Sequence, residues 1–387
     1  MPRSPSGLPA PAPEALAASE RLRAQICAEA ERGLLSFARF MALALYAPGL
    51  GYYAGGSRKF GEAGDFVTAP EISPLFAWCL ARQSADILAQ LGGGEILEFG
   101  AGTGALMIEM LRELERLDAL PARYLILEVS AELAERQRMR ALSEVPHLAQ
   151  RVAWLSQLPA AFEGVVIANE VLDAMPVQRF RFGDGGVEEL RVACTADGFV
   201  WQACPAEARL AERVRSLAQA CGFDAPYESE VGFAAEDWLR TLADVLHRGV
   251  ALLVDYGFSE REFYHPQRNS GTLMCHYRHR AHADPFFAVG LQDITAHVDF
   301  TAMAEAAHAA GLDVLGFSNQ ASFLMGAGLM EFLASPLEPR AQLERAAAVH
   351  KLTLPSEMGE LFKVLAVGRG VDGPLSGFRL RDDRARL

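Results

Sequence analysis

Short apolar runs alternate with helical patterns through the central part of the chain. Apolar residues that recur every three or four positions predict helices near residues 106–117 and 131–142. This alternation of strands and helices is typical of an α/β fold, in which a parallel sheet carries helices on both faces. The runs of mostly apolar residues that predict the buried strands lie at 95–99, 124–128, 152–155 and 164–169.

The residues before this region predict helices and one irregular loop. A helical pattern spans residues 20–46, and Gly33 is expected to break it into two helices. Residues 60–73 contain glycines and a proline without periodicity, so we expect a fixed loop, which is either a connector or a lid over the glycine-rich turn that follows. Ser73 and Pro74 then begin a helix to about Leu91, because serine caps helices and proline favours the first helical position.

Two insertions follow the central strands. Alternating polar and apolar residues at 178–200 predict antiparallel hairpins, and helices are expected at 206–220 and 234–248. A fully buried strand at 249–257 precedes residues 258–292, which lack periodicity and predict a long functional loop or a small cap. Further elements expected in order are a helix at 301–310, a strand at 312–318, helical residues at 322–348 and a last strand at 362–367.

The predicted domain organisation follows from these patterns. We expect a core at residues 93–370, with insertions near 178–248 and 258–292. The remaining segments are a disordered lead-in at 1–19, a helical and lid segment at 20–92, and a polar tail at 371–387.

Composition narrows the class of protein. The chain has 387 residues, 51% of them hydrophobic, and a net charge of −13, which argues against a nucleic-acid-binding surface. No apolar stretch has the length of a membrane span, and the N-terminus lacks a signal-peptide pattern. Glu14 and Glu20 come early for a transit peptide, so we expect a cytoplasmic protein and regard mitochondrial targeting as unlikely. Apolar helices outside the sheet make a homodimer plausible.

Neither cysteine nor histidine predicts a metal site. The six cysteines contain no CxxC pair, so we expect reduced thiols in a cytosolic protein. His276, His279 and His282 form the one histidine cluster, and we interpret them as part of a polar loop.

A glycine-rich turn follows the first central strand and carries the main candidate chemistry. Gly100-x-Gly102-x-x-Ala105 fits the dinucleotide-binding fingerprint, whereas Glu98 followed by Gly100, Gly102 and Gly104 fits the first motif of class I S-adenosylmethionine methyltransferases. A carboxylate at Glu98 would repel a pyrophosphate but attract the cationic sulfonium and amino groups of S-adenosylmethionine. Glu128, which ends the second strand, could hold the ribose of either nucleotide.

Several longer strings resemble one family. The chain looks like the MidA-like group of class I methyltransferases, which includes a mitochondrial complex I assembly factor that dimethylates an arginine. The resemblance spans roughly residues 36–368, and its one clear departure is Met274 and Cys275, where more polar residues are expected. The matching strings are Gly64-Asp-Phe-Val-Thr-Ala-Pro-Glu-Ile-Ser73, Leu97-Glu-Phe-Gly-Ala-Gly-Thr-Gly-Ala-Leu106, Ala168-Asn-Glu-Val-Leu-Asp-Ala-Met-Pro-Val177, Val254-Asp-Tyr-Gly257, Gly271-Thr-Leu273, Asp293-Ile-Thr-Ala-His-Val-Asp-Phe300 and Met358-Gly-Glu-Leu-Phe-Lys-Val-Leu365.

The resemblance implies a Rossmann-like methyltransferase sheet and a cofactor, S-adenosyl-L-methionine. It implies that Glu98 lies by the methionine end of the cofactor and that Glu128 holds the ribose. The residues that would wrap the cofactor are Gly100, Gly102 and Gly104, and those that would close over it are Gly64, Asp65, Pro70 and Glu71.

The resemblance also implies a substrate face after the fourth strand. We hypothesise that Glu170 and Asp173 clamp an arginine guanidinium, that Asn169 adds a hydrogen bond, and that His297 or Asp299 helps to remove a proton. The alternative for Asp173 is a helix cap.

The expected function is therefore methylation of a protein arginine, with a subunit of a respiratory complex as one substrate. The alternatives are an NAD-dependent oxidoreductase and a non-catalytic assembly module with a methyltransferase fold.

Overall fold

The computed structural model describes residues 8–30, 33–55, 68–334 and 338–387. The chain forms two compact units, each assembled from three segments. Unit 1 comprises Met1–Phe66, Asp173–Ala235 and Phe258–Asp299, and unit 2 comprises Val67–Leu172, Glu236–Gly257 and Phe300–Leu387. These units cut across the predicted boundary at residue 92, because sequence periodicity finds elements without showing which of them pack together.

Unit 2 contains the predicted parallel sheet. Its strands follow the order β15-β16-β10-β5-β2-β3-β4. The strands β10, β5, β2, β3 and β4 are parallel, whereas β16 is antiparallel to both β10 and β15. The α/β class is confirmed. The bounds are β2 (Glu95–Phe99), β3 (Tyr124–Leu127), β4 (Val152–Leu155), β5 (Phe162–Asn169), β10 (Leu246–Phe258), β15 (Asp313–Asn319) and β16 (Phe362–Arg369).

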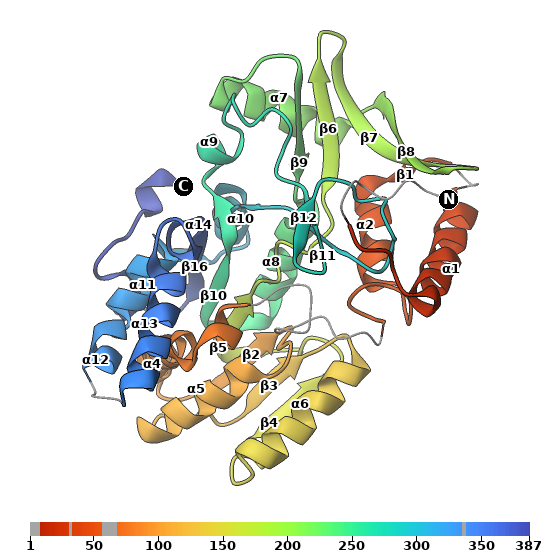
Figure 1. Cartoon of the computed structure of the whole chain (residues 1–387). Coiled ribbons are helices and arrows are strands. Elements are labelled where there is room, and N and C mark those ends of the chain that lie inside the picture. Colours follow the sequence, from red (N-terminus) through yellow and green to blue (C-terminus); the bar gives the residue numbers. More distant parts are fainter. Residues whose placement is uncertain (1–7, 31–32, 56–67, 335–337) are drawn as a thin grey trace. The chain divides into compact units, whose positions relative to one another are not determined.

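Helices cover this sheet and bury one continuous apolar core. The helix α4 (Pro74–Leu91) begins as predicted, with the Leu75 amide donating to Ser73 Oγ at 3.3 Å. Figure 1 shows α4 beside the C-terminal helices, far from it in sequence. The other helices are α3 (Ala69–Ile72), α5 (Ala105–Arg116), α6 (Ala131–Glu144), α8 (Phe233–Val245), α10 (Phe300–Ala309), α11 (Gln320–Gly326), α12 (Leu329–Leu333), α13 (Pro339–Thr353) and α14 (Met358–Leu361).

Two glycines set how closely the central strands approach. Gly164 on β5 lies opposite Glu95 of β2 and Gly249 of β10. A Cβ built on Gly164 would lie 1.9 Å from the Glu95 carbonyl oxygen, and one on Gly249 would lie 1.9 Å from the Gly164 carbonyl oxygen. Both glycines also have φ near +140°, a conformation that side-chain-bearing residues rarely adopt. Only glycine therefore fits at these positions.

Unit 1 contains the predicted hairpins. They form a sheet in the order β1-β7-β6-β9, with β8 paired to β7, and a smaller sheet has the order β12-β11-β13. Two strands of the smaller sheet, β11 and β12, lie within residues 258–292, so part of that segment has regular structure. The bounds are α1 (Pro13–Ala30), β1 (Leu35–Ser36), α2 (Phe37–Tyr46), β6 (Gln178–Gly183), β7 (Gly186–Thr195), β8 (Gly198–Pro205), α7 (Ala208–Cys221), β9 (Tyr227–Val231), α9 (Glu260–Phe263), β11 (Met274–Tyr277), β12 (Arg280–His282), β13 (Asp293–Thr295) and β14 (Val298–Asp299).

The N-terminal prediction needs correction. Residues 13–19, expected to be disordered, are the first part of α1. Ser19 is buried, and its hydroxyl donates to the Val289 carbonyl at 2.8 Å. The proline and alanine content suggested disorder, but Leu22 and Ile26 bury one face of this helix within unit 1 and so stabilise it.

The C-terminal prediction needs correction as well. Residues 371–387, expected to be a polar tail, pack onto unit 2 through the buried side chains of Val371, Leu375 and Phe378. The Phe378 ring lies 5.3 Å from that of Phe323, between ring centroids. These apolar residues are too widely spaced to show a helical or strand period, which is why the sequence pattern missed them.

The cysteine prediction is wrong for one pair. Cys27 on α1 and Cys194 on β7 form a disulfide, although 167 positions separate them. Cys79 and Cys275 are buried free thiols. Cysteine spacing alone could not reveal this pair, because it depends on α1 packing against β7.

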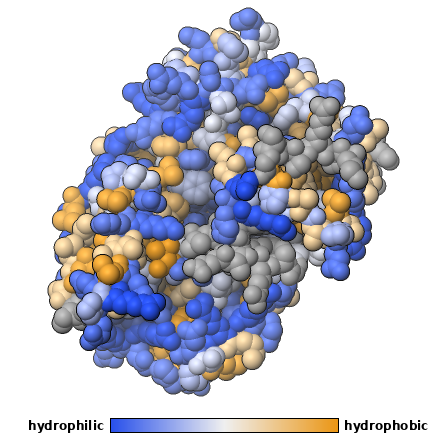
Figure 2. All heavy atoms as spheres, viewed as in Figure 1, coloured by the Kyte–Doolittle hydropathy of each residue, from blue (hydrophilic) through white to orange (hydrophobic). Residues whose placement is uncertain are grey.

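The surface is mostly polar where it is visible. Figure 2 shows hydrophilic side chains over much of the face in view, with hydrophobic ones interspersed. Exposed apolar residues scattered in this way are normal and define no interface, so the homodimer stays a prediction. Within the described ranges, no helix combines the length and apolar character needed to cross a membrane.

The glycine contact between β5 and β2 gives a stability prediction. Replacing Gly164 with alanine should lower the free energy of unfolding by about 3 kcal/mol or more, because backbone strain adds to a steric clash. Gly185 provides a matched control, since its added Cβ would meet nothing within 4 Å and its φ is ordinary. Urea unfolding followed by circular dichroism measures both. Equal midpoints for the two variants would contradict the prediction.

Candidate functional site

The glycine-rich turn joins β2 to α5 in unit 2. Gly100, Gly102 and Gly104 have φ values of 60°, 53° and 81°, all in the left-handed region. The Gly100 amide donates to the Leu127 carbonyl at 3.1 Å, and Gly104 is the N-cap of α5. The turn therefore presents backbone without Cβ atoms at the N-terminus of a helix, where a ligand can approach closely.

Glu98 precedes this turn and is almost fully buried. The Tyr124 hydroxyl donates to Glu98 Oε2 at 2.7 Å. The pKa of the Glu98 carboxyl is raised to about 7, mainly because the group is buried. The charge of Glu128 also raises this pKa, whereas the Tyr124 hydrogen bond lowers it. A carboxylate held in this way favours a cationic ligand, because a nearby positive charge stabilises its ionised form.

Glu128 follows β3 and is held by hydrogen bonds to both carboxylate oxygens. The Ser130 amide donates to Oε1 at 2.9 Å, and Gln137 Nε2 donates to Oε2 at 3.0 Å. A carboxylate oxygen can accept more than one hydrogen bond, so a ribose-binding role for Glu128 stays a prediction.

Gln137 connects several parts of this site and was missed by the sequence reasoning. It is fully buried on α6, and its Nε2 also donates to the Gly102 carbonyl at 2.9 Å. Trp154 Nε1 donates to its Oε1 at 2.8 Å. A single glutamine on an otherwise ordinary helix gives no sequence signal for this role.

The last residues of the predicted lid contact the glycine turn. The Thr103 hydroxyl donates to the Glu71 carboxylate, and Arg140 Nη1 donates to the Thr103 carbonyl at 3.2 Å. Pro70 lies in the first turn of α3, next to Glu71. Gly64 and Asp65 lie outside the described residues, and a cofactor-binding role for all four stays a prediction.

Asn169 is the last residue of β5, and Glu170 follows it directly. Glu170 has φ +53°, which is unusual for a residue with a side chain and marks a strained position. Its Oε1 accepts hydrogen bonds from Asn169 Nδ2 at 3.3 Å and from the Ala69 amide at 3.4 Å. Because Ala168 pairs with Phe99 of β2, this carboxylate comes from the strand next to the glycine turn.

The other three predicted catalytic residues belong to unit 1. Asp173 is buried, and its carbonyl accepts the Ala296 amide at 2.9 Å. The His297 ring stacks on Phe258, with 5.2 Å between centroids and 2° between planes, and Asp299 ends β14. No helix begins after Asp173, so the helix-cap alternative is wrong. Pro176 explains this, because proline disfavours helical conformation in the residue before it.

Thr272 and Glu230 hold the backbone at His297 and were not predicted. The His297 amide donates to Thr272 Oγ1 at 3.0 Å, and the Thr272 hydroxyl donates in turn to the buried Glu230 carboxylate. Burial raises the pKa of Glu230 above its ordinary value, and Arg179 opposes the rise.

The histidine cluster belongs to the hairpin of β11 and β12. In the part of the chain that the structure describes, no three His, Cys, Asp or Glu side chains gather as metal ligands would. Burial lowers the pKa of His282.

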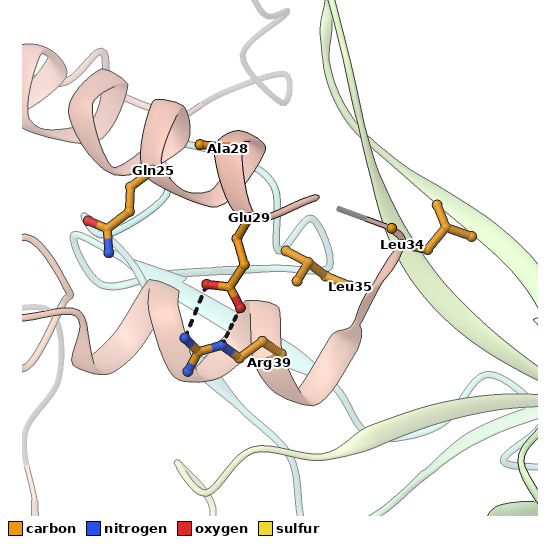
Figure 3. Close-up of a pocket in the computed structure, with 7 residues that line it drawn as sticks. Gln25, Ala28, Glu29, Leu34, Leu35 and Arg39 are labelled. Carbon is orange, nitrogen blue, oxygen red and sulfur yellow. Dashed lines mark hydrogen bonds and ion pairs between the residues drawn. The ribbon is translucent and has the colours of Figure 1, made fainter. Parts of the chain in front are cut away.

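A separate pocket of about 620 Å³ lies in unit 1 between α1 and α2 (Figure 3). Arg39 donates to Glu29 across it, at 2.7 Å from Nε and 3.1 Å from Nη2. It includes no predicted site residue, and we assign it no function. The other lining residues are Gln25, Ala28, Gly33, Leu34 and Leu35.

The residues around the glycine turn fit S-adenosylmethionine. The turn offers a cradle that a Cβ would fill, Glu98 offers a buried carboxylate to a cation, and Glu128 offers acceptors to a ribose. The Glu98 charge would repel a pyrophosphate, so the dinucleotide alternative fits less well.

Comparisons with known proteins support S-adenosylmethionine as the ligand. A family model for S-adenosyl-L-methionine-dependent methyltransferases matches residues 79–318. The chain is 47% identical to a Burkholderia thailandensis protein whose crystal structure holds S-adenosyl-homocysteine, with a TM-score of 0.94 over 98% of this chain and 100% of that one.

More distant relatives carry a more specific name. The chain is 28% identical to a Drosophila melanogaster protein named protein arginine methyltransferase NDUFAF7 homolog, mitochondrial, over 91% of this chain and 85% of the relative. It is 28% identical to the Mus musculus protein arginine methyltransferase NDUFAF7, mitochondrial, over 87% and 81%. The family match covers more than half of the chain and decides against the oxidoreductase alternative. The chain therefore belongs to the S-adenosyl-L-methionine-dependent methyltransferases, and S-adenosyl-L-methionine is its cofactor.

Proposed function

We propose that this methyltransferase modifies an arginine side chain of a protein. The observation that carries the proposal is the Glu170 carboxylate, held in a strained conformation at the end of the strand beside the glycine turn. The names of the Drosophila and mouse relatives support arginine as the acceptor.

The chemistry of arginine explains why a carboxylate is needed. A guanidinium stays protonated in water and offers a planar fork of N–H donors, which a carboxylate accepts in bidentate geometry. The bound cofactor supplies a methyl group on a positively charged sulfur. The Glu170 carboxylate binds the guanidinium, offsets its charge and orients one nitrogen for an in-line displacement.

The remaining predicted roles follow from the same scheme. Asn169 donates to Glu170 Oε1 at 3.3 Å and so restricts the rotation of that carboxylate. Asp173 is proposed to complete the clamp. One proton leaves the arginine nitrogen as it gains the methyl group, and His297 or Asp299 is the proposed acceptor.

We extend the proposal to a subunit of a respiratory complex as the acceptor protein. This step rests on the resemblance to a family that includes a complex I assembly factor. Incubating the enzyme with labelled cofactor and respiratory membranes tests it, because label should appear in one subunit of the complex. Label confined to other proteins would contradict this extension.

The first prediction concerns Glu98 and pH. With a pKa of about 7 in the free protein, Glu98 gains a proton as the pH falls from 7.5 to 6. The affinity for S-adenosylmethionine should therefore fall by roughly five- to tenfold over that range, since each pH unit below the pKa costs about tenfold in ionised form. Glu98→Gln should bind weakly at both pH values. Calorimetry measures both proteins, and an equal pH dependence in the variant would contradict the assignment.

Stability should show the opposite pH dependence. The folded-state pKa of Glu98 lies above the ordinary value of 4.5, so protonation favours the folded state and its contribution is lost as the pH rises from about 4.5 to 7. Glu98→Gln keeps an acceptor for Tyr124 and should unfold at a higher temperature than the wild type at pH 8.

The second prediction tests the acceptor. Labelled methyl transfer into a lysate, followed by mass spectrometry, should yield methylated arginine. Glu170→Gln should lose at least tenfold in rate while still binding S-adenosyl-homocysteine, because it loses the charge that holds the guanidinium.

Glu163→Gln is a matched control, since Glu163 is an exposed glutamate on β5, the strand that Glu170 follows, and has no place in the proposed site. Full activity of Glu170→Gln would remove Glu170 from the mechanism. Label on another residue type would exclude arginine.

A further inference from the structure

One buried carboxylate in unit 2 binds the turn that carries Glu170. Asp255 is fully buried near the end of β10. Its Oδ2 accepts the amides of Val171 at 3.2 Å and Leu172 at 2.9 Å. Its Oδ1 accepts the Tyr256 amide at 2.9 Å. Both oxygens are thus used to bind backbone rather than to pack the core.

These hydrogen bonds restrain the backbone at and after the strained residue Glu170. The Glu170 amide donates to the Val254 carbonyl at 2.9 Å, and the next two amides donate to Asp255. A side-chain-bearing residue in the left-handed region costs about 1–3 kcal/mol and persists only where its surroundings determine its conformation. Three consecutive amides fixed to the end of β10 provide that determination.

The same turn also contacts the glycine turn. A Cβ built on Gly100 would lie 3.7 Å from Val171 Cγ2, so Val171 packs beside Gly100. Asp255 therefore binds the turn in which Glu170 carries the carboxylate and Val171 packs beside Gly100.

We propose that Asp255 is a positioning residue that holds Glu170 in its active conformation. This inference rests on the proposed function of Glu170. Removing the carboxylate should release the turn, and Glu170 should then leave the orientation in which it binds the substrate.

Hydrogen exchange tests the structural part without any activity. In Asp255→Asn, the amides of Val171 and Leu172 should exchange at least tenfold faster than in the wild type. The control is Asp313→Asn, because Asp313 is an exposed aspartate at the start of β15. Unchanged exchange at these two amides in Asp255→Asn would overturn the proposal.

A second pair of variants tests the strain. Glycine adopts the left-handed region freely, so Glu170→Gly should make the turn less dependent on Asp255. The increase in exchange caused by Asp255→Asn should therefore be several-fold smaller in the Glu170→Gly background. If Asp255→Asn does not fold alone, the double variant should fold. Equal effects in both backgrounds, or failure of both to fold, would overturn the proposal.

Activity then separates positioning from cofactor binding. At saturating S-adenosylmethionine, Asp255→Asn should lose at least tenfold in methyl transfer, whereas its Kd for S-adenosyl-homocysteine should change less than threefold. Adding Asp255→Asn to Glu170→Gln should cause little further loss, and a full additional tenfold loss would overturn the proposal. If the wild type transfers no methyl to arginine, the proposed function fails, while the exchange measurements still decide the role of Asp255.

Discussion

The close approach of backbone at Gly164 and Gly249 determines the rest of unit 2. At these positions the strands β2, β5 and β10 leave no room for a Cβ, so their alignment cannot slip by one residue without a clash. A one-residue slip would also turn every side chain to the opposite face of the sheet. The contact at the amino ends of the strands therefore decides which side chains emerge at their carboxyl ends.

Two buried carboxylates lie near the carboxyl ends of these strands. Glu98 and Asp255 are both nearly or fully inaccessible to water, and both are satisfied by donors from neighbouring elements. Burial of a charge is unfavourable unless a partner compensates it. Asp255 accepts three backbone amides, whereas Glu98 accepts the Tyr124 hydroxyl and has a pKa of about 7. The carboxylate with the weaker compensation is the one that we predict to face the cationic cofactor.

Sequence patterns predicted those helices and strands whose formation depends on interactions between residues close together in the sequence. The strand at 95–99, the strand at 152–155 and the Ser73 cap agree with the structure, because apolar runs and capping preferences act within a few residues. The glycine turn was also recognisable, since three left-handed positions need three glycines. The alternative of a helix capped by Asp173 is wrong, because Pro176 disfavours a helix at the residues before it.

Sequence patterns could not predict features that depend on packing between segments far apart in the chain. The disulfide of Cys27 with Cys194 and the burial of Phe378 each join residues far apart in the chain. Gln137 is a feature of the same kind, because its role depends on hydrogen bonds to Gly102, Glu128 and Trp154, which lie in different elements. The spacing of residues along the sequence does not predict such contacts.

The C-terminal segment has a consequence for how the protein is made. The helix α4 is among the first elements of unit 2 to be synthesised, but it packs against a cluster that includes Val371, Leu375 and Phe378, which leave the ribosome much later. The core of unit 2 is therefore incomplete until these residues have been synthesised. Until then, the helices α4 and α11 lack side chains that cover them, and the nascent protein exposes that apolar surface to chaperones.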